Sequence, residues 1–218
     1  MRRLVIAFIA FSLSISPLSA QRHRTPFEYG HTVAVSLQGG PLVFVGEYTK
    51  AFKQNKEFWR VFAPHAELAL SYFISDGRSI RTSLSYSKKS SVLSMDDGYY
   101  PYTFNAAHLF VDYVVDFYRL GEYYVNFSPM LYAGAGVAHS FGFSDSGHPD
   151  PPITTSNWVP GFRIGGILEY DFKSGFGFFG DLGLEFLLDH YNGLKADTFP
   201  IDLNIRLGLG VIYHFKNY

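Results

Sequence analysis

Residues Ile201–Phe215, IDLNIRLGLGVIYHF, alternate between an apolar and a polar surface. The odd-numbered positions are all Ile, Leu, Val, Tyr or Phe, whereas the even-numbered positions carry Asp, Asn, Arg, Gly and His, with Ile212 as the one apolar exception. Because successive side chains of a strand point to opposite faces, one face of this strand is apolar and the other is polar. Such a strand suits a closed barrel with lipid outside and a polar interior.

The same alternation recurs upstream, and this recurrence decides the fold class. With the final strand it gives eight segments, which is an allowed size for a bacterial outer-membrane barrel. No apolar run outside the N-terminus is long enough for a membrane-spanning helix. The sequence therefore predicts an all-β fold, an eight-stranded antiparallel up-and-down transmembrane β-barrel. The predicted strands lie within residues 32–38, 65–72, 79–87, 108–117, 125–137, 162–172, 181–189 and 201–215.

The connections between these segments alternate in length. Short turns are predicted at Ser75-Asp76-Gly77, Arg119-Leu120-Gly121 and Lys173-Ser174-Gly175, where Gly or Asp permits positive φ. Longer connections are predicted at residues 39–62, 88–103, 144–158 and 191–200. This asymmetry is typical of outer-membrane barrels. The apolar stretch 41–52 is placed in the first long connection, as a short helix or a strand extension, because a ninth strand would break the alternation.

The N-terminus and the composition indicate an exported chain. Residues 1–20 are predicted to be a signal peptide: Arg2 and Arg3 precede an apolar stretch, and Leu18-Ser19-Ala20 is a suitable cleavage site. Residues 21–218 form the predicted barrel. The chain has no cysteine, so it has no disulfide or Cys-based metal site, and 18% of its residues are aromatic. Its formal charge is −1, which does not suggest a nucleic-acid partner.

Ionisable side chains occupy the polar face of the predicted strands. An eight-stranded barrel is just wide enough for its side chains to fill it, and an unpaired charge there would be costly. We therefore expect the inward arginines to lie among carboxylates, with Arg163 near Glu185 and Arg206 near Glu185 or Asp181. The alternative is an acidic lumen that attracts cations or acts as a proton-responsive gate. The predicted lumen ion network consists of Glu67, Arg81, Asp112, Arg163, Glu169, Asp181, Glu185 and Arg206.

A search for catalytic chemistry gives only weak candidates. His139-Ser140 would suit a lipid hydrolase, but adjacent strand residues point to opposite faces and cannot form a dyad. Asp96-Asp97 and Asp189-His190 could serve an acid-based protease at the rim, although acids are common in loops. No phosphate loop, zinc signature or nucleotide fingerprint occurs. The sequence thus predicts no catalytic, cofactor-binding or metal-binding residues, and no enzyme.

The mature chain resembles the small outer-membrane β-barrel (porin-family) proteins of Bacteroidota, which are related in architecture to the OmpA and OmpX barrels. The resemblance rests on Leu18-Ser19-Ala20-Gln21, on the opening strand 31–38 with Gly39-Gly40-Pro41, and on the closing strand 206–215. It implies a Gram-negative outer-membrane location and a terminal aromatic, Phe215 or Tyr218, for the assembly machinery.

The expected function is structural or mediated by the outer loops. A narrow pore or small-solute transporter is the first alternative, and a lipid-modifying hydrolase is the second. The expected partners are outer-membrane lipid and, during biogenesis, the barrel-assembly machinery; the ligand of the loops is open.

Overall fold

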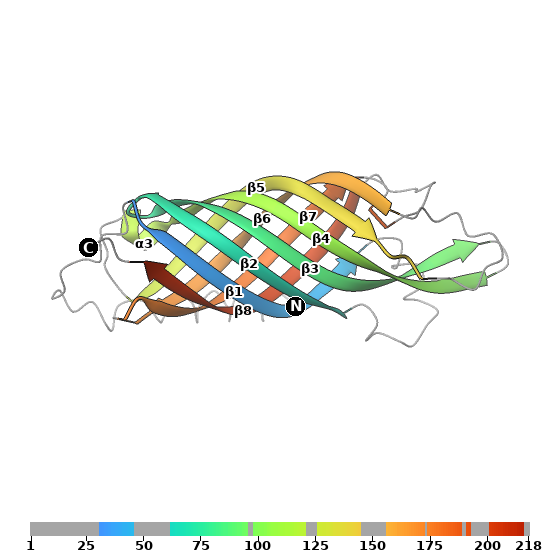
Figure 1. Cartoon of the computed structure of the whole chain (residues 1–218), viewed down its shortest axis with the longest axis horizontal. Helices are drawn as coiled ribbons and strands as arrows, with labels where there is room; N and C mark the ends of the chain where they lie inside the picture. Colours follow the sequence, from blue (N-terminus) through green and yellow to red (C-terminus); the bar gives the residue numbers. More distant parts are fainter. Residues whose placement is uncertain are drawn as a thin grey trace, which may run out of the picture.

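Eight strands close into one antiparallel barrel in the order β1 to β8, with β8 pairing back onto β1 (Figure 1). The computed structural model describes residues 31–45, 62–95, 98–120, 126–144, 156–172, 174–188, 191–192 and 201–215. The predicted fold class is confirmed. The strands are β1 (Val33–Val45), β2 (Phe62–Ser75), β3 (Arg78–Met95), β4 (Gly98–Asp116), β5 (Phe127–Phe141), β6 (Ser156–Asp171), β7 (Phe176–Leu188) and β8 (Ile201–Phe215).

The outward face of the barrel is apolar, as the alternation predicts. Leu209 is 74% exposed, and Leu182 is 58% exposed. Among the strand residues with described side chains, only Arg78 and Lys88 place a charge on this face, and both belong to β3. Ten residues of a strand tilted by about 40° cover a height of about 25 Å. This height matches the apolar band of a transmembrane barrel.

Aromatic side chains border this band at both ends, where a bilayer would meet water. One girdle lies at the end of the barrel where β1 begins and β8 ends. It includes the exposed residues Tyr72, Tyr113, Tyr170, Phe176 and Phe215. The girdle at the opposite end includes Phe62, Tyr86, Trp158 and Phe162, also exposed.

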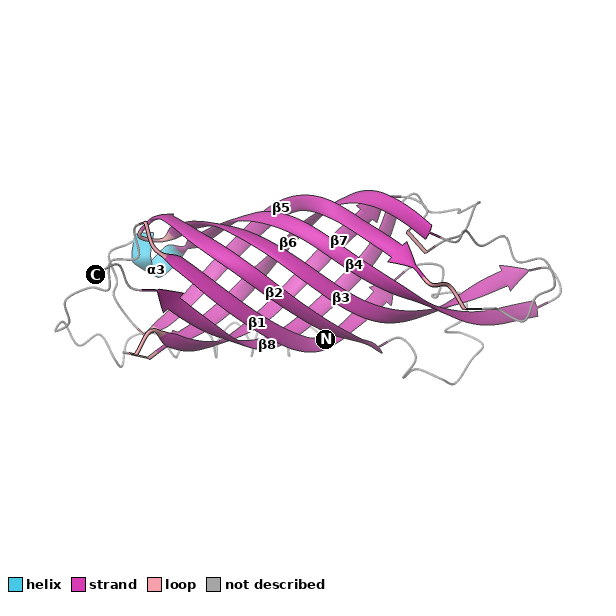
Figure 2. Ribbon diagram, viewed as in Figure 1, coloured by secondary structure: helices cyan, strands magenta, loops and turns pink. Residues whose placement is uncertain are grey.

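The two ends of the barrel differ in how their strands are joined. The turn end carries the β2–β3 turn at Asp76-Gly77, the short helix α3 (Phe117–Leu120) and the β6–β7 turn (Figure 2). Gly77 and Gly175 have φ of 85° and 90°, which confirms the predicted need for positive φ. The opposite end is called the loop end. Helix α3 was not expected from the sequence, and no helix in the described ranges is long and apolar enough to cross a membrane.

The prediction of a long connection at residues 88–103 is wrong. Strand β3 continues to Met95 and β4 begins at Gly98, so the two strands form a long hairpin that projects at the loop end (Figure 1). Among the described strands, residues Lys88–Met95 and Gly98–Phe104 pair only with each other. The pairing of β2 with β3 ends at Ser87 of β3, and the pairing of β5 with β4 ends at Asn105 of β4. We call residues 88–104 the ribbon.

The long connections predicted at residues 39–62 and 144–158 are shorter than expected, because β1 extends to Val45 and β6 begins at Ser156, whereas β7 ends at Leu188 and β8 begins at Ile201, close to prediction. Residues 41–45 continue β1, which agrees with a strand extension for the first part of the stretch 41–52. The rest of that stretch lies outside the described residues, as do residues 1–20 and Tyr218. Phe215 is the last residue of β8 and is exposed.

Candidate functional site

A buried ion network crosses the middle of the lumen. Arg163 on β6 donates from Nε to Asp112 Oδ1 at 2.7 Å and from Nη2 to Asp112 Oδ2 at 2.5 Å. Its Nη1 donates to Glu67 Oε2 at 3.0 Å. Arg81 on β3 also donates to Asp112, from Nε to Oδ2 at 3.0 Å. Asp112 on β4 therefore binds two arginines, neither of them from its own strand.

Arg206 on β8 is the second centre of this network. It donates from Nη2 to Asp181 Oδ2 at 3.0 Å and from Nη1 to Glu185 Oε1 at 3.4 Å, and it also pairs with Glu67. Arg163 Nη1 lies 3.8 Å from Glu185 Oε1. These contacts agree with the expected positions of Arg163 and Arg206 beside Asp181 and Glu185.

Neutral side chains also join the network, and two of them each bind two of its members. Gln38 on β1 donates to Glu67 Oε1 at 2.9 Å and to Asp181 Oδ2 at 3.2 Å. The Tyr132 hydroxyl donates to Asp181 Oδ1 at 2.8 Å and accepts from Arg206 Nη2 at 2.8 Å. All eight strands thus contribute a side chain, and the ions are almost fully buried. Both neutral residues follow from strand parity, but their contacts need the register of distant strands.

Glycines make the cross-lumen reach of Tyr132 possible. Tyr132, Gly165, Gly183 and Arg206 form one row across β5, β6, β7 and β8. A Cβ at Gly165 or Gly183 would collide with the Tyr132 hydroxyl. The sheet therefore leaves a channel in which a tyrosine on β5 meets an arginine on β8. The glycines on the inward face thus relieve crowding in the lumen.

Seven of the eight predicted network residues meet at this level, but Glu169 does not. Its Oε1 lies 3.0 Å from Nε2 of His214 and 3.9 Å from Nη2 of Arg119, nearer the turn end. Sequence alternation assigns Glu169 to the correct face. It does not fix the height of a residue in the barrel, which depends on the strand register.

An apolar cap fills the lumen between the ion network and the loop end. Tyr191, from the connection after β7, is fully buried and packs edge to face against Phe44 and Phe104, with ring centroids 6.0 and 5.7 Å away. Tyr102 donates its hydroxyl proton to the Asn192 carbonyl at 2.8 Å and so holds this connection inside the barrel. The cap also contains Leu42, Ala63, Ala106, Phe110, Ala138, Val159 and Leu187.

A chain of hydrogen bonds links the cap to the ion network. Lys89 donates to the Tyr191 hydroxyl and to Asn204 Oδ1, the latter at 2.8 Å, and its Nζ lies 4.4 Å from the Tyr191 ring centroid. Burial raises the pKa of the Tyr191 phenol well above its usual range, so the hydroxyl keeps its proton. Because its oxygen accepts from Lys89, that proton is donated to His108 Nε2 at 2.7 Å, and His108 Nδ1 donates to Glu185 at 3.0 Å.

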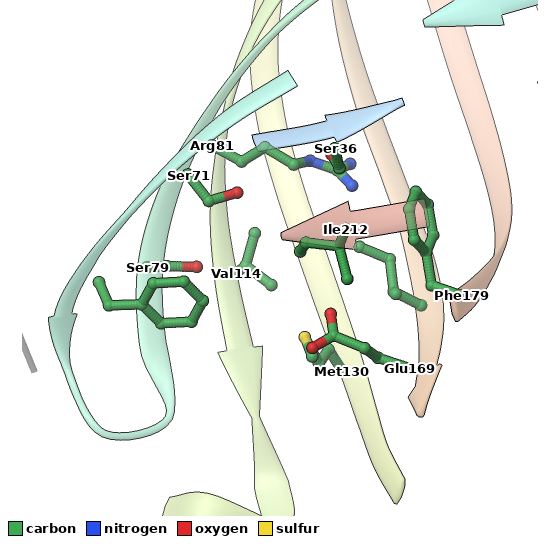
Figure 3. A pocket seen from close by; sticks show the side chains of 11 residues that line it. Ser36, Ser71, Ser79, Arg81, Val114, Met130, Glu169, Phe179 and Ile212 are labelled. Atoms are coloured by element: carbon green, nitrogen blue, oxygen red, sulfur yellow. The ribbon is translucent and has the colours of Figure 1, made fainter. Parts of the chain in front are cut away.

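A second apolar layer lies between the ion network and the turn end. Its buried members are Ala34, Phe73, Val114, Met130, Tyr132, Ile167, Phe179 and Ile212. A cavity of ≈ 20 Å³ in this layer is lined by Arg81 at one end and Glu169 at the other (Figure 3). That volume holds about one water molecule. The lumen is therefore filled by a cap, an ion network and an inner apolar layer.

The candidate catalytic pair of the sequence is not formed. Ser140 is buried inside, whereas His139 faces outward and its Nε2 lies 2.7 Å from Ser156 Oγ on β6. The His139 ring also stacks on Trp158, with centroids 4.2 Å apart and an interplanar angle of 6°. Asp96-Asp97 and Asp189-His190 lie outside the described residues.

The geometry defines a class of protein: a small transmembrane β-barrel with a filled lumen. No protein-family model matches the chain, and no curated protein matches it either. Several solved structures are similar to it. Neisserial surface protein A has a TM-score of 0.55 and 12% identity, over 84% of this chain and 97% of that chain. A major outer membrane protein from Thermus thermophilus has a TM-score of 0.54 and 14% identity, over 85% of this chain and 100% of that chain.

A third similar structure is Ail, the attachment invasion locus protein of Yersinia pestis, in complex with the heparin analogue sucrose octasulfate. Its TM-score is 0.50, with 16% identity over 85% of this chain and 99% of that chain. At these identities the likeness concerns the fold. The neighbours are small outer-membrane β-barrels, and this chain has their architecture.

Proposed function

We propose that this protein resides in the outer membrane of a Gram-negative bacterium, of the Bacteroidota, after cleavage of residues 1–20. The apolar band between Arg78 and Lys88, its two aromatic girdles and the architecture of the similar structures support this location. Outer-membrane barrels have short periplasmic turns. The turn end therefore faces the periplasm, and the ribbon faces outward.

The proposed role is structural and interaction-based, without transport or catalysis. One observation carries it: the lumen is blocked by apolar side chains on both sides of the buried ion network. A solute would have to displace Tyr191 and then break the contacts of Arg163 and Arg206. Buried ion pairs of this kind are costly to separate.

The ribbon is the proposed interaction element. Its far part extends beyond the closed part of the barrel, whereas Lys89, Tyr102 and Phe104 at its base are buried in the lumen. No strand in the described residues pairs with its outer edges, although the Thr103 backbone hydrogen-bonds to Ser144. An unpaired edge can accept a further strand from a partner. The attachment protein among the similar structures is compatible with such a role. Outer-membrane lipid and, before insertion, the barrel-assembly machinery are the other proposed partners.

Planar-bilayer recording tests the blocked lumen. We expect the purified barrel to insert without steady current, whereas a 16-stranded porin in the same bilayer gives discrete steps. Reproducible single-channel steps from the barrel would support the pore instead. Mass spectrometry of lipid A from cells with and without the protein tests the hydrolase alternative, and we expect identical spectra.

The role of the ribbon is tested in a strain that lacks the gene for this protein, by measuring the resistance of the cells to detergent. We expect the deletion to lower this resistance. One plasmid carries the intact gene, and a second replaces residues 92–101 with Asn-Gly, which keeps the pairing of Ser91 with Tyr102. If both plasmids restore resistance, the barrel itself is the structural element. If only the intact gene restores it, the ribbon makes the required contact. Failure of both plasmids would contradict the proposed role.

A further inference from the structure

Three potential metal ligands converge at the turn end of the lumen. His214 Nε2, on β8, lies 3.0 Å from Glu169 Oε1 and 3.3 Å from Asp171 Oδ1, both on β6. All three donor atoms lie within 4.8 Å of one another. Gly177 on β7 pairs with Asp171, and a Cβ there would approach Asp171 Oδ1 to 2.8 Å. The missing side chain on β7 leaves room for ligands from β6 and β8 to meet.

The spacing of these atoms fits one coordination sphere. Zinc binds imidazole nitrogen and carboxylate oxygen at about 2.0–2.2 Å, so neighbouring ligand atoms of an octahedral or tetrahedral ion lie about 2.8–3.6 Å apart. The two measured separations, 3.0 and 3.3 Å, fall in this range. An ion could therefore replace the proton between His214 and the two carboxylates with little movement of the side chains.

Arg119 binds the Asp171 oxygen that does not face His214. Its Nη2 donates to Asp171 Oδ2 at 2.6 Å, whereas Asp171 Oδ1 is the atom that faces His214. Arg119 Nε lies 3.3 Å from Asp116 Oδ2, and the Asp116 carboxylate also accepts from the backbone N–H of Arg119. Arg119 therefore orients the Asp171 carboxylate from behind, as outer partners do in metal sites.

The charges at this end favour a divalent cation. Arg119 contacts three carboxylates, those of Asp116 at 3.3 Å, Glu169 at 3.9 Å and Asp171 at 2.6 Å. A divalent ion bound by Glu169 and Asp171 would add positive charge beside these carboxylates.

Further oxygen atoms are available for the remaining coordination positions. Ser128 on β5 is 1% exposed and pairs with Glu169 across the strands. Its hydroxyl has no hydrogen-bond partner within the described part of the chain. The water-sized cavity also reaches Glu169, on the side away from the turn end (Figure 3). A buried hydroxyl without a partner is unusual and calls for an explanation such as an ion or a water.

We propose that Glu169, Asp171 and His214 form a binding site for a divalent transition-metal ion at the turn end of the barrel. One imidazole and two carboxylates suit zinc best, because imidazole favours zinc over the alkaline-earth ions. Asp171 keeps a partly exposed side chain at the end of β6, so the ion reaches the site from that mouth of the barrel.

Zinc titration of the untagged protein, purified from outer membranes in detergent, tests the site by calorimetry. The variants His214→Gln and Asp171→Asn remove ligands, and His65→Gln is the matched control, since His65 is a buried inward histidine on β2. We expect one zinc site per barrel, weakened roughly 10- to 100-fold or more in both ligand variants and unchanged in the control. Cobalt supplies a second readout, because its visible absorption bands should disappear with the same substitutions.

Absence of zinc binding by the folded wild-type barrel would overturn the proposal. So would unchanged affinity in both ligand variants, or an equal loss in His65→Gln. If His214→Gln fails to fold, the partly exposed Asp171→Asn variant decides the test alone.

Discussion

Arg163 on β6 binds both carboxylate oxygens of Asp112 on β4, although β5 lies between the two strands. The residue of β5 that pairs with both of them is Gly134. A Cβ at this position would collide with Asp112 Oδ1 and with the Val111 carbonyl. The ion pair that anchors the network therefore depends on the absence of a side chain beneath it.

Gly134→Ala should lower the free energy of unfolding by about 1–3 kcal/mol, because an added methyl group in a packed interior forces its neighbours to shift. Gly180→Ala is the matched control, since a Cβ there would meet only Leu209 and Gly208 atoms at 3.7 and 3.9 Å. Reversible urea unfolding in lipid vesicles measures the free energy of unfolding of both variants. Equal stability of the two variants would contradict the role given to Gly134.

Arg163→Met should lower the free energy of unfolding by about 3–5 kcal/mol, because it removes a buried positive charge that binds both Asp112 and Glu67 and leaves each carboxylate with only one arginine. Arg78→Met removes an exposed arginine at the edge of the apolar band and should change stability by about 1 kcal/mol at most. The same vesicle unfolding experiment compares them. A loss at Arg163 no larger than that at Arg78 would mean that the network is solvated.

Tyr191→Phe should cost about 1–3 kcal/mol, because Lys89 and His108 Nε2 both lose a buried hydrogen-bond partner while the ring packing is kept. Tyr86→Phe is the control: its hydroxyl donates to Asn105 in an exposed position. Denaturation midpoints of the two variants give the comparison. A Tyr191→Phe variant as stable as Tyr86→Phe would show that the cap does not depend on this hydroxyl.

Strand number and the inward face could be predicted from the sequence because both follow from a period of two. Arg163, Arg206 and Glu185 all lie on the predicted face, and short-range pairing of β6 with β7 was enough to bring Arg163 near Glu185. The ion pair of Arg163 with Asp112 could not be predicted from the sequence, since it depends on the combined register of β4, β5 and β6.

Two other features escaped prediction for different reasons. The ribbon contains Lys88-Lys89, three serines and Asp96-Asp97-Gly98, which are residues typical of loops, although its strands pair from Lys88–Asn105 to Met95–Gly98. Tyr191 lies in a connection between strands, and no periodic pattern shows that a loop residue folds back into the lumen. The His139 side chain hydrogen-bonds to Ser156 and not to Ser140, because Ser156 lies on the adjacent strand β6.

Spin labels on the outward face test the central claim, that hydrocarbon surrounds the barrel. The chain has no cysteine, so a cysteine introduced at Leu182, Leu207 or Pro101 is unique. In vesicles, labels at Leu182 and Leu207 should be reached by oxygen but shielded from a water-soluble nickel chelate, whereas the ribbon label at Pro101 should be reached by the chelate. Equal access of the chelate to all three positions would contradict a transmembrane barrel.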